Sequence, residues 1–337
     1  MIVTLLLSMP GFEVKALFIT QAGVKISYGD YEKLKNLGIH DYEIQLLPES
    51  SINEYLSISK EYKTVYLDIN YIHERTLVID GVETVEVNEL SKDEYDSSVN
   101  SDESAFLYQN NDLNTSLMAS QSATKTDTYK TMTLSGSYSA ITNQYFVRLT
   151  VKWDRLPLSR LHDVIAITHM DSVVLNMKDV NGSQQPNYSA KILYTQNRFD
   201  SRTGGLSTQD ISKTINLNYQ QCATTCFRQS LNGILSVQNL PNDSVSSYYN
   251  SDDGYYVYGY IVKSILHSVE GYFVPRTLFT NPEPFHGGFK HMTSDQFYSF
   301  GNLTLSYAPP YISYTPNFGI INPSYDIELE TQINIFK

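Results

Sequence analysis

A two-residue alternation of large apolar side chains constrains the fold of this chain more than any other feature. In the clearest run the apolar positions are Tyr145, Val147, Leu149, Val151 and Trp153. The positions between them are Phe146, Arg148, Thr150 and Lys152, so most of them are polar. Side chains of a β-strand point alternately to the two faces of its sheet. The run therefore predicts a strand with one buried face and one mostly hydrated face.

The same period recurs along the chain, together with residues that form tight turns. Residues 255–262 and 327–335 alternate in this way, although the continuation of the first run is also compatible with a helix. Asp80-Gly81 separates two apolar runs, which is a strong signal for a β-hairpin. Asn181-Gly182 and Gly204-Gly205 predict further turns. The pattern favours a mainly β fold, with an antiparallel β-sandwich or barrel-like domain.

The N-terminal region carries short helical patterns instead. Asp30 and Asp41 are expected to cap two helices, Gly38 to end the first of them, and a third follows Pro48. Ser91 to Glu94 fits a capping box for one short turn. We therefore divide the chain into a small α+β region with a hairpin at 17–95, a polar linker or mobile loop at 96–125, and an antiparallel β domain at 126–337.

Charge limits the classes of partner. The 337 residues include 24 Lys and Arg against 36 Asp and Glu, so the formal net charge is −12. This balance argues against binding to a nucleic-acid backbone and against polybasic docking to a membrane. A transmembrane helix needs roughly 20 consecutive apolar residues, and we find no such stretch and predict no transmembrane segment.

The first residues and the two cysteines bear on location. Residues 1–16 combine a short apolar run with small residues at a cleavage position, which is typical of the end of a secretory signal peptide. No basic residue precedes the run, so the segment is either a truncated signal peptide or a buried N-terminal strand. The signal peptide predicts a secreted, extracellular protein. Cys222 and Cys226 exclude a disulfide-dense scaffold, and their pairing stays open.

Several short motifs resemble a family of uncharacterised exported β-rich proteins of Gram-positive bacteria. The motifs are residues 34–39, 43–44, 62–63, 129–133, 146–153 and 163–167. The resemblance covers about residues 31–167 and includes no diagnostic catalytic motif. It implies export and a β core, and it implies no activity because the family has none assigned.

Two groups of residues are candidates for a metal site. His286 and His291 flank a Gly-Gly segment that we interpret as a flexible loop where two imidazoles converge. Asp252 and Asp253, followed by Gly254, resemble a fragment of a calcium loop, as do residues 179–182, but neither has the distal Glu of an EF-hand. Exposed loop histidines and hairpin turns are the alternative interpretation. We expect no cofactor, with calcium as the alternative.

Glu328 and Glu330 are candidates for catalysis. They lie two positions apart on one strand face, a separation of about 7 Å, which is compatible with the carboxylate pair of a glycoside hydrolase. The hydrated face of a terminal strand shows the same pattern and protects an edge from aggregation.

Tyrosine is abundant, with 27 residues in the chain. Tyr rings present an apolar face and a hydroxyl, which suits binding surfaces. Cross-strand packing accounts for the tyrosines between 255 and 260. Tyr307, Tyr311 and Tyr314, around Pro309-Pro310, are therefore the predicted ligand-binding residues.

Three functions follow from these observations. The first is a secreted, non-enzymatic β-sandwich protein that binds a cell-surface glycan or protein partner through Tyr-rich loops. The second is a pore-forming or membrane-active protein in which the Ser/Thr-rich stretch 131–139 forms an inserting hairpin. The third is an exported carbohydrate-active hydrolase that uses Glu328 and Glu330. We favour the first because the sequence contains no recognisable catalytic motif.

Overall fold

The computed structural model describes most of the chain in separate ranges. These are residues 17–79, 82–109, 124–157, 160, 162–169, 172–201, 207–216, 226–230, 233–244, 248–251, 254–276, 283–292, 303–305, 312–314, 325–326 and 331–335. The expected signal peptide at 1–16, the Gly204-Gly205 turn and Cys222 lie outside the described residues.

Within the described part, antiparallel strands form a nine-stranded sheet in the order β12-β11-β16-β6-β5-β3-β4, and β15 and β8 also pair with β16. Its strands are β3 (Lys63–Ile79), β4 (Val82–Leu90), β5 (Thr124–Ser139), β6 (Gln144–Arg155), β8 (Val173–Leu175), β11 (Tyr188–Asp200), β12 (Ser207–Asn216), β15 (Tyr248–Asn250) and β16 (Tyr255–Pro275). We call this the large sheet.

A second, six-stranded sheet has the order β13-β14-β7-β17-β20, with β21 also paired with β17. Its strands are β7 (His162–His169), β13 (Cys226–Ser230), β14 (Gly233–Asn239), β17 (Glu283–Met292), β20 (Tyr325–Asp326) and β21 (Thr331–Ile335). Three small hairpins complete the described strands: β1 (Leu17–Ile19) with β2 (Lys25–Ser27), β9 (Met177–Val180) with β10 (Ser183–Pro186), and β18 (Leu303–Leu305) with β19 (Ile312–Tyr314).

The two sheets pack face to face around one apolar core. The core draws Leu149 and Trp153 from the large sheet and Ile167 and Phe289 from the second, all fully buried. The approach is close: a Cβ added to Gly287 of β17 would lie 2.9 Å from Leu149 Cδ1 of β6. The fold is therefore mainly β with antiparallel strands, as the alternation predicts, and the described sheets form a sandwich.

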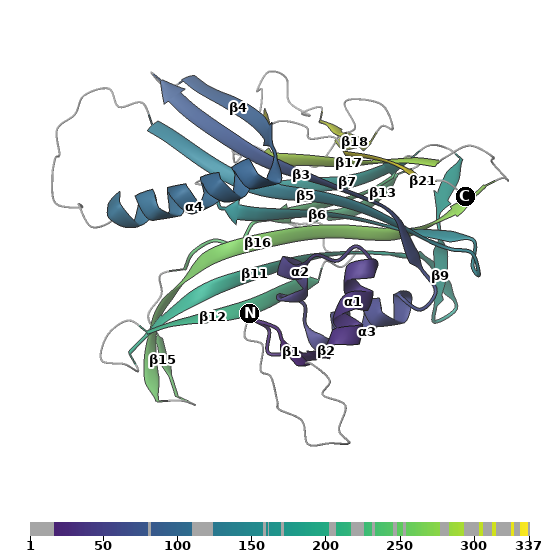
Figure 1. Cartoon of the computed structure of the whole chain (residues 1–337), viewed down its shortest axis with the longest axis horizontal. Coiled ribbons are helices and arrows are strands. Elements are labelled where there is room, and N and C mark those ends of the chain that lie inside the picture. The colour runs from purple at the N-terminus through teal and green to yellow at the C-terminus, as the bar shows by residue number, and fades with distance from the viewer. Residues whose placement is uncertain are drawn as a thin grey trace.

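Short helices cover the other face of the large sheet (Figure 1). They are α1 (Tyr28–Asn36), α2 (Asp41–Ile44) and α3 (Glu49–Ile58), and a second apolar cluster joins them to the sheet. The prediction that the second face of residues 146–152 is hydrated is therefore wrong at Arg148 and Thr150. Arg148 is 2% exposed and Thr150 is 1% exposed, because the helices lie over them.

Two features of the structure bear on the predicted division into domains. Strand β3 pairs with β5 from Lys63 to Val78, so a boundary near residue 95 would cut through the large sheet. Helix α4 (Lys92–Gln109) includes residues 96–109 of the segment 96–125 expected to be a linker, and residues 110–123 lie outside the described residues. The predicted capping box does open it, since the Ser91 hydroxyl donates to Glu94 and accepts from the Glu94 backbone N–H.

Local turn signals are confirmed. Ile79 pairs with Val82 across Asp80-Gly81, and Asn181 (φ 54°) and Gly182 (φ 81°) have the backbone of a tight hairpin turn. The first helix is capped one turn earlier than expected, by Ser27, whose side chain accepts a hydrogen bond from the Asp30 N–H. No helix in the described ranges is long and apolar enough to cross a membrane.

Candidate functional site

Among the residues that the structure describes, exposed aromatic rings gather on the hairpin of β15 and β16. Tyr248 and Tyr249 of β15 pair with Val257 and Tyr256 of β16. The side chains of Tyr248, Tyr249, Tyr256 and Tyr258 are 45%, 55%, 52% and 44% exposed. We call these four exposed residues together the tyrosine face; Tyr249 and Tyr256 share one side of the hairpin, and Tyr248, which pairs with Val257, lies on the other side. Exposed aromatic patches of this kind mark interaction surfaces in soluble proteins.

The hairpin projects because β16 is much longer than its neighbour β6. Strand β6 pairs with β16 only between Ile265 and Phe273, so the segment 255–262 extends beyond it. Figure 1 shows β16 curving away from the sandwich toward β15 at one end of the molecule. The segment is held at its base, where the Val262 N–H donates to Asp243 at 2.8 Å, and at its far end, where the Tyr256 N–H donates to the Ser201 hydroxyl at 2.9 Å.

Contacts between the rings order the tyrosine face. The rings of Tyr249 and Tyr256 lie 5.0 Å apart at an angle of 57°. The hydroxyls of Tyr248 and Tyr260 lie 2.8 Å apart. This hydrogen bond, followed by burial, raises the pKa of Tyr260 to about 12. The face is thus partly preorganised, which reduces the entropy lost on binding.

Sequence reasoning assigned these tyrosines to packing, and that is correct for only part of the segment. Tyr255 is buried, with the Arg198 guanidinium 5.3 Å from its ring centroid. Tyr256 and Tyr258 alternate with buried residues and point outward. The strand period gave this signal, but only the structure shows that the side chains of Tyr256 and Tyr258 stay exposed. Tyr307 and Tyr311 lie outside the described residues, and Tyr314 ends β19.

The predicted carboxylate and calcium sites are mostly untested. Glu328 and Glu330 lie outside the described residues, as do Asp252 and Asp253. In residues 179–182, Asp179 Oδ1 accepts the Gly182 N–H at 2.8 Å, so this carboxylate closes a hairpin turn. The turn interpretation is therefore confirmed there.

The interpretation of residues 286–291 as a flexible loop is wrong. Both histidines lie in β17, whose register with β7 is regular from Phe285 to Met292. Residues five positions apart on a strand face opposite ways, so His286 and His291 do not converge on one metal. His291 Nδ1 instead lies 2.8 Å from Asp163 Oδ1, and Trp153 Nε1 donates to Asp163 Oδ2 at 2.8 Å. The described residues contain no group of three metal-ligand side chains.

A Ser–His pair lies inside the sandwich and was not found from the sequence. Ser236 Oγ of β14 and His267 Nε2 of β16 are 2.8 Å apart. Both residues are 0% exposed, so no substrate reaches them in this structure. Burial lowers the pKa of His267 to about 4, against an opposing effect of Asp163. The pair is a buried polar contact between the two sheets.

The stretch 131–139, expected to form an inserting hairpin, lies in the middle of the large sheet. It belongs to β5, which pairs with β3 on one side and β6 on the other. Its residues from Thr131 to Ser137 are buried. The stretch is therefore not an exposed hairpin.

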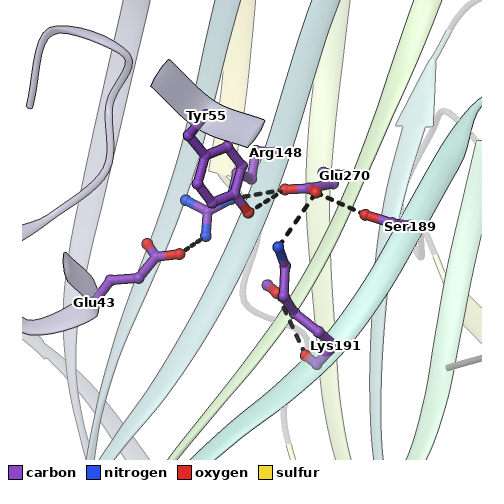
Figure 2. A network of polar contacts seen from close by, with 7 residues as sticks. Glu43, Tyr55, Arg148, Ser189, Lys191 and Glu270 are labelled. Atoms are coloured by element: carbon purple, nitrogen blue, oxygen red, sulfur yellow. Dashed lines mark hydrogen bonds and ion pairs between the residues drawn. The ribbon is translucent and has the colours of Figure 1, made fainter. Parts of the chain in front are cut away.

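A buried ionic network joins the helices to the large sheet (Figure 2). Arg148 of β6 donates through Nε to Glu270 at 3.0 Å and through its terminal nitrogen to Glu43 of α2. Tyr55 of α3 donates to Glu270 at 2.8 Å. On the other side of Glu270, the Ser189 hydroxyl donates at 2.6 Å and Lys191 Nζ forms an ion pair at 3.6 Å.

The charges of this network balance, with two carboxylates and two cations. Burial alone would raise the pKa of Glu270, but Lys191 and Arg148, with hydrogen bonds from Ser189 and Tyr55, hold it below its usual value. Burial, then the charge of Glu270, raises the pKa of Tyr55 far above its usual value. Glu270 thus stays ionised and Tyr55 stays a donor at neutral pH. The network fixes the helices on the sheet.

Comparisons with known proteins identify no family. No protein-family model matches the chain, and no curated protein matches it. Among solved structures, the chain is similar to the Clostridium perfringens NetB toxin in its membrane-inserted form, with 11% identity and TM-score 0.19 over 49% of this chain and 78% of that one.

Two further structures share this distant similarity. AvmM, which catalyses macrocyclization in alchivemycin A biosynthesis, has 10% identity and TM-score 0.19 over 57% of this chain and 80% of its own. A pore-forming protein has 8% identity and TM-score 0.19 over 49% of this chain and 74% of its own. These similarities assign no function to the chain.

Proposed function

We propose that this chain is a secreted, non-enzymatic recognition protein that binds a neutral cell-surface glycan through the tyrosine face. One observation carries the proposal: four exposed tyrosines gather on the projecting hairpin of β15 and β16. A protein partner is the alternative ligand, and binding measurements distinguish it from a glycan.

The chemistry of the face favours a polar ligand without charge. Each tyrosine offers an apolar ring for stacking and a hydroxyl for hydrogen bonding, which matches the alternating C–H and hydroxyl groups of a sugar. Tyrosine also loses little conformational entropy on binding because it has two side-chain torsions. The net charge of −12 opposes the approach of polyanions at low ionic strength.

The supporting sandwich gives the face a rigid base. The segment 255–262 is continuous with the part of β16 that lies in the core, where Ile265 and Val269 are fully buried. A binding surface held on a rigid strand keeps its geometry better than one on a free loop. Export, expected from the N-terminal segment, would place this surface outside the cell.

Replacing Tyr256 or Tyr258 by Ser is expected to weaken glycan binding about tenfold or more, because each change removes a stacking ring. The measurement is a screen of wild-type protein on neutral polysaccharides, followed by calorimetric titration of the best ligand with each variant.

Tyr28→Ser is the matched control, because Tyr28 is 53% exposed on α1, outside the tyrosine face. Equal affinity of wild type and the Tyr256 and Tyr258 variants would contradict this site. Binding to no polysaccharide, together with retention of a protein partner that the two variants lose, would replace the glycan by a protein.

A further inference from the structure

We propose that α1–α3 form a cap that leaves the large sheet as a unit, and that protonation of His40 releases it in mild acid. This regulatory device is independent of the tyrosine face.

The cap has an apolar core of its own. Leu34, Leu37, Ile44, Leu47 and Ile52 are almost fully buried within the three helices and their connections. The large sheet adds Phe146, Leu193 and Leu266 as the buried members of the same cluster. Most of the buried members of this cluster therefore belong to the cap segment, and contacts among them can be retained when the cap separates.

The surface beneath the cap is polar. Buried hydroxyl side chains line this face of the sheet: Thr133, Ser135 and Ser137 on β5, Thr150 on β6 and Ser268 on β16. Gly38 packs directly on it, since an added Cβ would lie 2.9 Å from Ser135 Cβ. Water can solvate such a face once it is exposed, which lowers the penalty for opening relative to an apolar interface.

His40 lies where the cap meets the ionic network. It is the N-cap residue of α2, three positions before Glu43, the cap residue that pairs with Arg148. Its ring stacks on Tyr42 at 5.4 Å and 6°, and its Nε2 is buried with no hydrogen-bond partner among the described residues. A proton on this nitrogen would be a buried, unpaired charge in the closed state.

The charged groups around His40 oppose its protonation. Burial lowers its pKa to about 4, and Lys35 of α1 and Arg148 of β6 act in the same direction. Asp41 favours protonation, but it already accepts from Lys35 at 2.6 Å and from Tyr31 at 2.5 Å. On the far side of Tyr42, Lys152 lies 4.8 Å from the Tyr42 ring centroid and adds another positive charge near α2.

The sign of the pH effect follows from these values. In the open cap His40 regains its ordinary pKa of 6.5, whereas in the closed cap the pKa is about 4. The neutral ring therefore favours closure above pH 6.5, and this contribution is lost as the pH falls toward 4. By linkage, the opening constant rises about 30-fold between about pH 7.5 and about pH 5. The pKa values of Asp41 and Glu270 are lowered, so these carboxylates stay charged in this window.

Hydrogen exchange of the full chain tests the proposal. Amides of residues 28–58 and of the core strands β6 and β16 are followed at about pH 7.5 and about pH 5, after correction for intrinsic exchange. We expect cap amides to open more often than core amides at both values, and their opening constant to rise about 30-fold in acid. Equal opening constants for cap and core at both values would overturn the separate cap.

His40→Gln isolates the trigger because it keeps a polar side chain that does not titrate. We expect this variant to lose the acid-dependent rise in cap exchange, while His73→Gln, a control on β3, keeps it. A full rise in His40→Gln would overturn the role of His40. If His40→Gln does not fold, the wild-type comparison of cap and core still decides whether acid opens the cap by itself.

Discussion

Replacing Arg148 by Met is expected to lower the free energy of unfolding by about 3–5 kcal/mol. The substitution keeps an unbranched side chain of similar length but leaves Glu43 and Glu270 buried, each without its guanidinium partner. An uncompensated buried carboxylate is costly because it has lost its hydration and gained no counter-charge. Urea unfolding at neutral pH, followed by fluorescence, measures the difference.

Two further variants are compared with Arg148→Met. Arg160→Met removes an ion pair with Asp243, whose side chain is 42% exposed, and we expect a loss of no more than about 1 kcal/mol. Adding Glu43→Gln to Arg148→Met is expected to recover part of the stability, since Glu270 then keeps Lys191 as its counter-charge and no unpaired carboxylate remains. A loss for Arg148→Met as small as that for Arg160→Met would contradict the network.

The second large effect is acid destabilisation of the sandwich through His267. Its pKa is about 4 in the folded protein against an ordinary value of 6.5, because the ring is fully buried. The neutral ring therefore stabilises the fold above pH 6.5, and this contribution is lost as the pH falls to about 4. From the two pKa values, we expect a loss of about 3 kcal/mol between pH 7 and pH 4.

His267→Gln separates this effect from other titrations. The amide can still bond to Ser236 but does not take up a proton in this range, so the variant should lose less stability in acid than wild type. Urea unfolding at pH 7, 5 and 4 measures the difference of the two slopes. Identical slopes for wild type and His267→Gln would show that burial does not perturb this histidine.

Signals that depend on a few adjacent residues were predictable from the sequence. Ile79 and Val82 pair on either side of Asp80-Gly81, Asn181-Gly182 makes a turn, and the Ser91–Glu94 capping box opens a helix. These patterns work because the side chains bond to, or permit, the local backbone itself.

Features that depend on what covers a surface were not predictable. The alternation around Arg148 is real, but its polar face is buried by helices from residues 28–58. Helix α4 is mostly polar, and tertiary contacts help to hold it: Tyr95 is buried and donates to Asp154 of β6 at 2.7 Å. Sequence periodicity carries no information about these long-range partners.

The candidate site also combines features that were predictable from the sequence with features that were not. The excess of tyrosine and the strand at 255–262 were both evident from the residues alone, and both are features of the site. The exposure of Tyr256 and Tyr258 depends on which segments pack over that side of the hairpin, and this packing is set by the tertiary fold.

The most direct test of the account is a ligand footprint on the intact protein. With the best polysaccharide from the screen bound at saturation, hydrogen exchange is compared with that of the free protein across all peptides. We expect slower exchange of the backbone amides of residues 248–262 alone, on β15 and the projecting part of β16. Unchanged exchange there, with protection elsewhere on the molecule, would contradict the tyrosine face as the recognition site.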